Sequence, residues 1–222
     1  MRHLFLLAAL FCACISYAQI RVQERLPKSK TGFALTTAKT RAKIYYDVND
    51  ALVIKRSAEL FARDIQMVTG QKPELIQKRE RAKALVIVGT IEKNQWICEL
   101  AQKGKIDIRP LQGAWERYLI QTVDNPSPGV AKALVIAGSD RRGAAYGLFS
   151  ISEMMGVSPW YWWGDVPVKT HKALYVDAPP TYSKTPSVKY RGIFLNDEDW
   201  GLKPWAAKTF EKERGNIGPR TY

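Results

Sequence analysis

Apolar residues are concentrated in two unbroken runs, at residues 84–89 and 133–138. A run that is apolar at successive positions suits a strand buried on both faces, as in a parallel sheet. Shorter strands are predicted at residues 32–35 and 43–46, and a longer one at 115–123. Helical patterns separate these runs, so the order of elements predicts an α/β fold, a small sheet with flanking helices.

The first predicted helix runs from residue 51 to residue 69. Asn49 or Asp50 is expected as its N-cap, and Gly70 ends it. Its apolar positions recur at helical spacing and are Leu52, Ala58, Leu60, Phe61, Ile65 and Val68.

Two further helices are predicted, at residues 94–103 and 141–155. In the second of these, one stripe of the helix is expected to face the core, formed by Ala145, Leu148, Phe149, Ser152 and Met155. Residues 124–129 form a cluster of turn-forming residues before the second apolar run.

The first 18 residues are predicted to be a signal peptide. Arg2 and His3 form a short polar start, residues 4–15 are apolar, and residues 16–18 have the small-x-small pattern of a cleavage site. The apolar stretch is too short to span a bilayer, and no later stretch reaches that length. We expect an exported chain, periplasmic or secreted, that begins at Gln19 and has no transmembrane segment.

Composition changes this picture little, but charge adds to it. The 222 residues are 46% hydrophobic and 25% charged, which is typical of one or two globular domains. The formal net charge is +13, and it becomes +12 without the leader, whose one charged residue is Arg2. The basic residues are dispersed and no nucleic-acid-binding motif accompanies them, so we expect no nucleic-acid partner. An acidic polysaccharide is the better candidate for an anionic ligand.

Cysteine and histidine are too scarce for several kinds of site. Cys98 is the single cysteine outside the leader, which excludes an internal disulfide and a cysteine-based metal site. His171 is the single histidine outside the leader, which excludes a multi-histidine metal site and a histidine-based triad. We therefore expect no metal and no cofactor.

A glycine-rich turn, Gly138-Ser-Asp-Arg-Arg-Gly143, joins the second apolar run to the last predicted helix. Glycines at a helix N-terminus can let backbone N–H groups bind phosphate. The spacing matches neither the dinucleotide-binding pattern nor the P-loop. We favour a tight turn in which Ser139 or Asp140 caps the helix.

An aromatic segment, residues 158–167, contains Trp160, Trp162 and Trp163. Aromatic rings stack on the C–H faces of sugars, and they also fill interfaces between domains. Both interpretations stay open on the sequence. The flanking prolines and Gly164 argue against regular structure through the whole segment.

An acidic segment follows a predicted strand at residues 190–195, and it begins Asn196-Asp197-Glu198. Enzymes with parallel strands place their chemistry at the C-terminal strand ends, and glycoside hydrolysis needs a pair of carboxyl groups. Alternation puts Arg191 and Asp197 on one side of the strand and Asn196 and Glu198 on the other. The pattern does not say which side faces a site, and an ordinary acidic turn is the competing interpretation.

These segments occur in a specific order: Val86-Ile-Val-Gly-Thr90, Ala133-Leu-Val-Ile-Ala-Gly-Ser-Asp140, Arg142-Gly-x-x-Tyr-Gly147, Gly156-Val-Ser-Pro-Trp-Tyr-Trp-Trp163, Lys189-Tyr-Arg-Gly-Ile-Phe194 and Asn196-Asp-Glu198. In this order, over most of residues 31–200, the sequence resembles glycoside hydrolase family 115, which contains xylan α-1,2-glucuronidases. The resemblance implies an N-terminal α/β domain at residues 19–178, a linker at 179–188 and the start of a (β/α)8 catalytic barrel at 189–222. Family enzymes remove glucuronic acid, or its 4-O-methyl form, from xylan with inversion.

The resemblance also implies roles for particular residues. Asp197 and Glu198 are the catalytic candidates at the end of the first barrel strand. Arg191 and Asn196 are expected to bind substrate, as are Trp160, Trp162 and Trp163 where the α/β domain meets the barrel. The implied partner is glucuronoxylan or a xylo-oligosaccharide, and the implied assembly of the full-length enzyme is a homodimer.

A complete (β/α)8 barrel takes roughly 250 residues, so this chain is expected to hold only the first strand of one. We therefore expect an N-terminal piece that is inactive alone, in which residues 31–178 fold without the barrel and residues 189–222 do not. The alternative hypothesis is a free-standing module that binds acidic xylan through residues 160–163.

Overall fold

The computed structural model describes residues 19–194, 196, 202–209 and 212–215. It divides into two compact units, Met1–Pro186 and Ser187–Tyr222, and each is described by itself. The predicted signal peptide lies outside the described residues.

The first unit is built on a six-stranded sheet in the order β4-β3-β5-β7-β6-β9. The two apolar runs form its central strands, β5 (Ala82–Thr90) and β7 (Val130–Gly138), which pair in parallel. β3 (Lys43–Tyr46) and β4 (Leu75–Ile76) continue the parallel part. β6 (Tyr118–Ser127) pairs antiparallel with β7, and β9 (Thr181–Tyr182) pairs antiparallel with β6. The prediction of buried parallel strands is confirmed.

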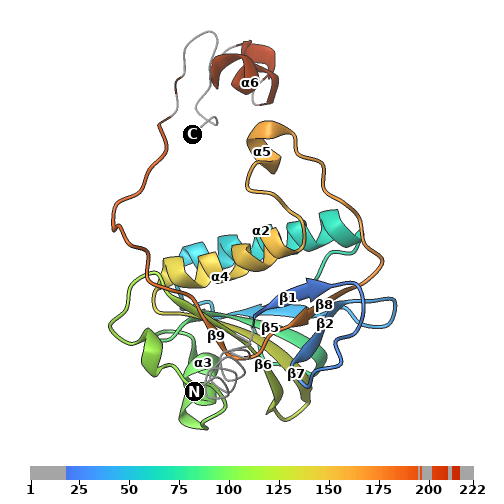
Figure 1. The fold of residues 1–222 in the computed structure, drawn as a ribbon, viewed down its shortest axis with the longest axis vertical. Coiled ribbons are helices and arrows are strands. Elements are labelled where there is room, and N and C mark those ends of the chain that lie inside the picture. Colours follow the sequence, from blue (N-terminus) through green and yellow to red (C-terminus); the bar gives the residue numbers. More distant parts are fainter. Residues whose placement is uncertain (1–18, 195, 197–201, 210–211, 216–222) are drawn as a thin grey trace, which may run out of the picture. The chain divides into compact units, whose positions relative to one another are not determined.

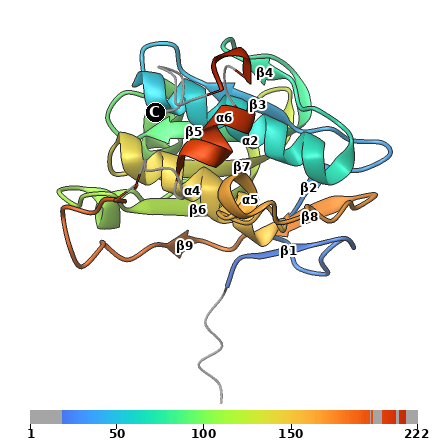
Figure 2. The ribbon, with the colours of Figure 1, turned by 90° about the horizontal axis from the view of Figure 1, so that it is seen from above.

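Helices cover both faces of this sheet, as Figure 1 shows. α2 (Leu52–Thr69) and α4 (Arg141–Met154) lie side by side on one face, which is clearest from above in Figure 2. α3 (Gln95–Gln102) packs on the other face, together with the short 3-10 helix η1 (Arg109–Leu111). The sheet therefore has an apolar core on each side, as buried parallel strands require.

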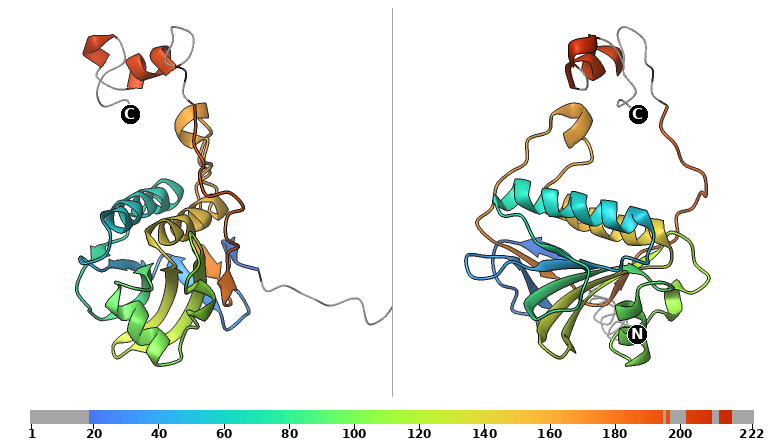
Figure 3. Two further views of the ribbon diagram at one scale, coloured as in Figure 1. Left: turned by 90° about the vertical axis from the view of Figure 1, so that its left-hand side faces the viewer. Right: turned by 180° about the vertical axis from the view of Figure 1, so that it is seen from behind.

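A second, three-stranded sheet has the order β1-β8-β2 and is antiparallel. Its strands are β1 (Arg21–Gln23), β8 (Leu174–Asp177) and β2 (Gly32–Thr36). Phe33, Leu35 and Val176 are fully buried and belong to the same core as α2 and α4. Figure 3 shows this small sheet beside the main one. Of these three strands, the sequence predicted β2 alone.

Several local expectations need correction. The N-cap of α2 is Ala51, which makes no side-chain cap bond, because the Asp50 carboxylate instead accepts from Thr90 N at 2.7 Å. On α4, Phe149 is 37% exposed rather than buried, since Ala144 and Ile151 complete the inward face. The turn expected over residues 124–129 is shorter, because β6 continues through a bulge to Ser127.

The aromatic segment is irregular except for α5 (Tyr161–Gly164), a single turn of helix. The segment expected to be a linker, residues 179–188, contributes β9 to the main sheet before the first unit ends. Arg117 Nε donates to Ser183 O at 2.8 Å, and Ser183 N donates to Tyr118 O at 2.9 Å. The chain is thus attached to the sheet as far as Ser183.

The second unit contains α6 (Leu202–Thr209) and the 3-10 helix η2 (Lys212–Arg214), neither of which the sequence pattern indicated. Residues 190–194, the described part of the expected barrel strand, form no strand. Tyr190, Ile193 and Phe194 are 87%, 81% and 90% exposed. A strand needs a neighbour to accept and donate its backbone hydrogen bonds, and within the described residues no other strand pairs with this segment.

Candidate functional site

The acidic segment is only partly described. Asp197 and Glu198, the catalytic candidates, lie outside the described residues. Asn196 O accepts from Leu202 N at 2.8 Å, which joins Asn196 to the start of α6. Arg191 is exposed, and its Nη1 donates to Val188 O at 2.7 Å. Both residues belong to the second unit, whereas the tryptophans of the aromatic segment belong to the first.

Trp160 is the described part of the aromatic candidate site. Its side chain is 67% exposed, and its backbone N donates to Ser158 Oγ at 3.1 Å. The side chains of Trp162 and Trp163 lie outside the described part of the chain. Beside this segment, a cavity of about 600 Å³ lies between α2 and α4 and is lined by Leu60, Arg63, Asp64, Tyr146, Phe149, Ser150, Ser152, Glu153, Val157, Ser158, Pro159 and Tyr161.

The glycine-rich turn does not form a phosphate site. Asp140 is the N-cap of α4, and its Oδ1 accepts from Arg142 N and Gly143 N at 2.9 and 2.8 Å. Its Oδ2 accepts from Glu116 N at 2.7 Å. The N–H groups that a phosphate would use are therefore already bonded to this carboxylate. The prediction of a capped tight turn is confirmed.

The carboxyl end of β5, at the edge where open α/β sheets usually bind ligands, is closed by the chain itself. Asn94 is fully buried, and its Oδ1 accepts from Trp96 N and Ile97 N, both at 3.1 Å. Its Nδ2 donates to Val88 O at 3.0 Å. A Cβ at Gly89 would come within 2.4 Å of that nitrogen, so no ligand space remains there. From the sequence, Asn94 is expected only to begin a helix.

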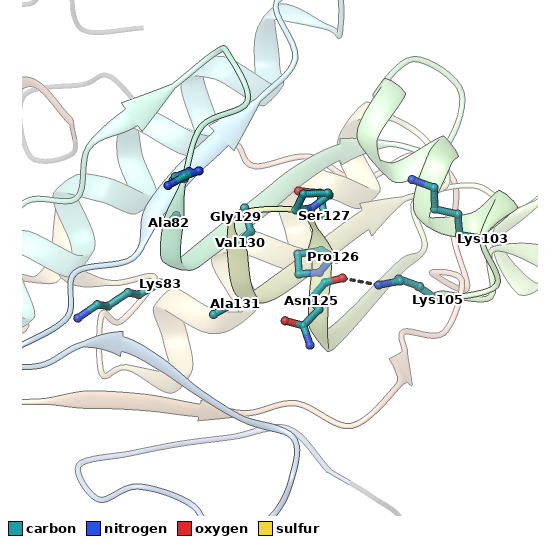
Figure 4. A pocket seen from close by; sticks show the side chains of 12 residues that line it. Ala82, Lys83, Lys103, Lys105, Asn125, Pro126, Ser127, Gly129, Val130 and Ala131 are labelled. Atoms are coloured by element: carbon teal, nitrogen blue, oxygen red, sulfur yellow. Dashed lines mark hydrogen bonds between the residues drawn. The ribbon is translucent and has the colours of Figure 1, made fainter.

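A basic groove lies at the opposite, amino-terminal ends of β5 and β7. It has a volume of about 770 Å³ and is lined by Arg81, Ala82, Lys83, Lys103, Lys105, Asn125, Pro126, Ser127, Pro128, Gly129, Val130 and Ala131. Four of these side chains are cationic and none is acidic. Figure 4 shows Lys83 on one side of the β6–β7 hairpin and Lys103 and Lys105 on the other. The sequence shows the excess of basic residues, but the pattern along the chain does not indicate this groove.

Backbone and side-chain bonds hold the walls of the groove together. Ala82 N donates to Gly129 O at 3.0 Å, which fixes the hairpin turn to the start of β5. Lys105 Nζ donates to Asn125 O, and Gln121 Nε2 donates to Lys105 O at 3.1 Å. A Cβ at Gly129 would come within 2.9 Å of Arg81 Cγ, so the absence of a side chain there leaves room for the arginine stem.

Within the described ranges, no group of three or more His, Cys, Asp or Glu side chains could hold a metal ion. Over the same ranges, no helix has the length and apolar character needed to cross a membrane.

Comparison with known proteins identifies the family. The model of glycosyl hydrolase family 115 matches residues 183–222, the segment with Arg191, Asn196, Asp197 and Glu198. The solved structure of BtGH115A, described as a family GH115 4-O-methyl-α-glucuronidase with specificity for decorated arabinogalactans, is 35% identical over 85% of this chain, with a TM-score of 0.67. The chain belongs to glycosyl hydrolase family 115. The resemblance stated from the sequence is thereby confirmed.

This family 115 chain spans 23% of the length of BtGH115A. More distant likenesses are CpGH84D, with 10% identity over 75% of this chain and 23% of that one at a TM-score of 0.43, and the GH20 β-N-acetylhexosaminidase of Streptomyces coelicolor A3(2), with 12% identity over 77% and 25% at 0.38. These two are too distant to bear on function. A comparison with curated proteins finds no match.

Proposed function

We propose that this chain is a part of an exported α-glucuronidase, and that the whole enzyme removes glucuronic acid or its 4-O-methyl form from glucuronoxylan or xylo-oligosaccharides. The 35% identity with BtGH115A over 85% of this chain supports the activity. BtGH115A is described as specific for decorated arabinogalactans, so it does not support xylan as the substrate. The choice of xylan rests on the sequence resemblance to the family. Export rests on the pattern of residues 1–18.

The proposed reaction is an inverting hydrolysis. One carboxylic acid protonates the glycosidic oxygen while a carboxylate on the other face activates water. Asp197 and Glu198 are proposed to contribute to this pair, and Asn196 to position substrate. Arg191 is proposed to bind the uronate carboxylate, because a guanidinium binds carboxylates through two parallel hydrogen bonds.

A chimera tests this proposal. Residues 19–222 replace the matching segment of BtGH115A, and uronic acid release from glucuronoxylan and from decorated arabinogalactan is measured. We expect an active chimera whose first product is the β-anomer, as NMR can show. Asp197→Asn or Glu198→Gln should lower kcat by roughly 100-fold or more, the usual contribution of a general acid or base.

The neighbouring Asp199→Asn is the matched control and should keep most of the activity. A chimera that folds, shown by its melting transition, but releases no uronic acid from either polymer would contradict the proposal. The 222-residue chain alone should release none, because it spans 23% of the length of the glucuronidase that it resembles.

A second candidate function is supported by the 67% exposure of Trp160. The chain would then be a binding module that holds acidic xylan by stacking this ring on a sugar. Titration with glucuronoxylan should quench tryptophan fluorescence to saturation, and Trp160→Ala should remove most of that change. Quenching that is unchanged in Trp160→Ala would exclude this residue as the contact.

A further inference from the structure

The basic groove gathers four cationic side chains and no acidic one in its lining, and the proposed catalytic chemistry does not use it. Arg81 and Lys83 come from the start of β5, whereas Lys103 and Lys105 follow α3. These two pairs are about 20 positions apart in sequence, and the packing of α3 beneath the sheet puts them around one hollow.

Three of the four cations in the groove remain available to a ligand, whereas Lys105 Nζ already donates to Asn125 O. Within the described part of the chain, Arg81 and Lys83 have no carboxylate partner, and both are exposed. Lys103 Nζ lies 3.9 Å from Glu99 Oε2, but Arg79 already binds both oxygens of that carboxylate at 2.8 and 2.6 Å. These hydrogen bonds lower the pKa of Glu99, so it stays ionised and committed to Arg79.

Lys132 shows the contrast. It lies on β7 directly after Val130 and Ala131, which line the groove, but Lys132 itself does not line it. Its Nζ donates to Gly32 O at 3.0 Å and pairs with Asp124 Oδ1 at 3.1 Å. Lys132 is thus used within the fold, as is Lys105, while Arg81, Lys83 and Lys103 line the hollow without such a backbone bond.

We propose that the basic groove is a non-catalytic docking site for an acidic polysaccharide, bound through the carboxylates of its uronic acid residues. The choice of ligand rests on the proposed function, since a glucuronidase works on a polymer that carries this anion repeatedly. A single exposed ion pair contributes little. Several cations around one open groove can bind carboxylates spaced along a chain, and each further contact is then intramolecular.

The lining favours a polysaccharide over a nucleic acid. It contains no aromatic ring, whereas single-stranded nucleic acids are usually bound by base stacking on such rings. Pro128 is exposed and gives the hollow apolar surface beside its charges. The C–H faces of sugars can pack on that surface while the carboxylates face the cations.

The test is a binding titration of the purified chain with glucuronoxylan, followed by affinity electrophoresis or calorimetry. The triple variant Arg81→Gln, Lys83→Gln, Lys103→Gln should bind about tenfold more weakly, if each lost contact has the typical effect of an exposed pair. The control triple Lys93→Gln, Arg141→Gln, Lys172→Gln removes the same charge from exposed positions outside the groove and should bind like the unmodified chain.

Three results would overturn the proposal. They are equal binding by the two triple variants, equal binding of the chain to xylan stripped of its glucuronic acid, and tighter binding to single-stranded DNA than to glucuronoxylan. Lys105 is left unchanged so that its bond to Asn125 O is kept, and melting curves check that both variants fold. If the chimera is inactive but the groove variant binds more weakly than the control variant, only the proposed glucuronidase activity is refuted. If the chimera is active but the two triple variants bind equally, only the proposed role of the groove is refuted.

Discussion

At the scale of single residues, the glycines of the strand-to-helix turn are explained by packing. A Cβ at Gly138 would lie 2.2 Å from Ala144 N, and one at Gly143 would lie 2.1 Å from Arg117 O. Both neighbours are backbone atoms, one in α4 and one in the residue directly before β6, so they cannot move aside cheaply. The two glycines thus let α4 approach the sheet closely. In the sequence, glycines selected for this packing look like those of a phosphate-binding turn.

Gly143→Ala tests this explanation. We expect a loss of about 1–3 kcal/mol in the free energy of unfolding, or more, because overpacking a tight contact has this typical effect. Urea unfolding measures it. Gly192→Ala is the control, since no atom lies within 4 Å of its added Cβ. If the two variants are equally stable, the close approach of α4 to Arg117 is not what selects glycine.

At the scale of elements, the pairing of α2 with α4 buries a carboxyl group. Asp64 on α2 is 5% exposed and faces the cavity between the helices. Desolvation raises its pKa above the ordinary 3.8, and the Ser152 hydroxyl and the Arg63 charge offset this only in part. The helix pair therefore holds a group whose charged form the fold disfavours.

The stability of Asp64→Asn should depend on pH. In the folded state Asp64 holds its proton to higher pH than in the unfolded state, so the wild type loses stability as pH rises through 3.8 toward the raised pKa. The variant lacks this loss. It should therefore gain stability relative to the wild type above that window and show no gain below it. Unfolding curves at several pH values measure the difference, and a variant that is weaker by the same amount at every pH would contradict the desolvation argument.

At the scale of the whole molecule, the chain consists of a packed α/β unit and a second unit of different character. The sheet of the first unit ends at β9, and its last described attachment is at Ser183. Beyond it, Lys184 and Lys189 are exposed and lie outside regular structure. Tyr190, Ile193 and Phe194 add exposed apolar surface, which is an aggregation hazard when a strand has no partner.

Limited proteolysis should separate the two units. We expect trypsin to cut early after Lys184 or Lys189, because exposed segments without regular structure are preferred cleavage sites. A core ending near residue 184 should then persist, as mass spectrometry can show. If residues 189–222 resist as long as β5 and β7 do, they form a stable fold with their own protection, and the expectation that they need barrel neighbours is wrong.

The sequence by itself determined the central strands β5 and β7, the capped start of α4 and the family. These features are local: continuous apolar runs report burial on both faces, Asp140 lies directly before the helix that it caps, and a family pattern is a linear order of residues. It also nominated Asp197 and Glu198, which stay predictions.

Only the tertiary structure decided which distant residues meet. Asp50 looked like a helix cap, but the parallel pairing of β3 with β5 brings it to Thr90, 40 residues away, where its carboxylate has a buried partner. The basic groove arises in the same way, because the packing of α3 and the β6–β7 hairpin collects cations from two segments. The periodicity of apolar residues indicates whether a position is buried. It does not indicate which residue from a distant segment will lie beside that position, and the effect of a charged side chain depends on that neighbour.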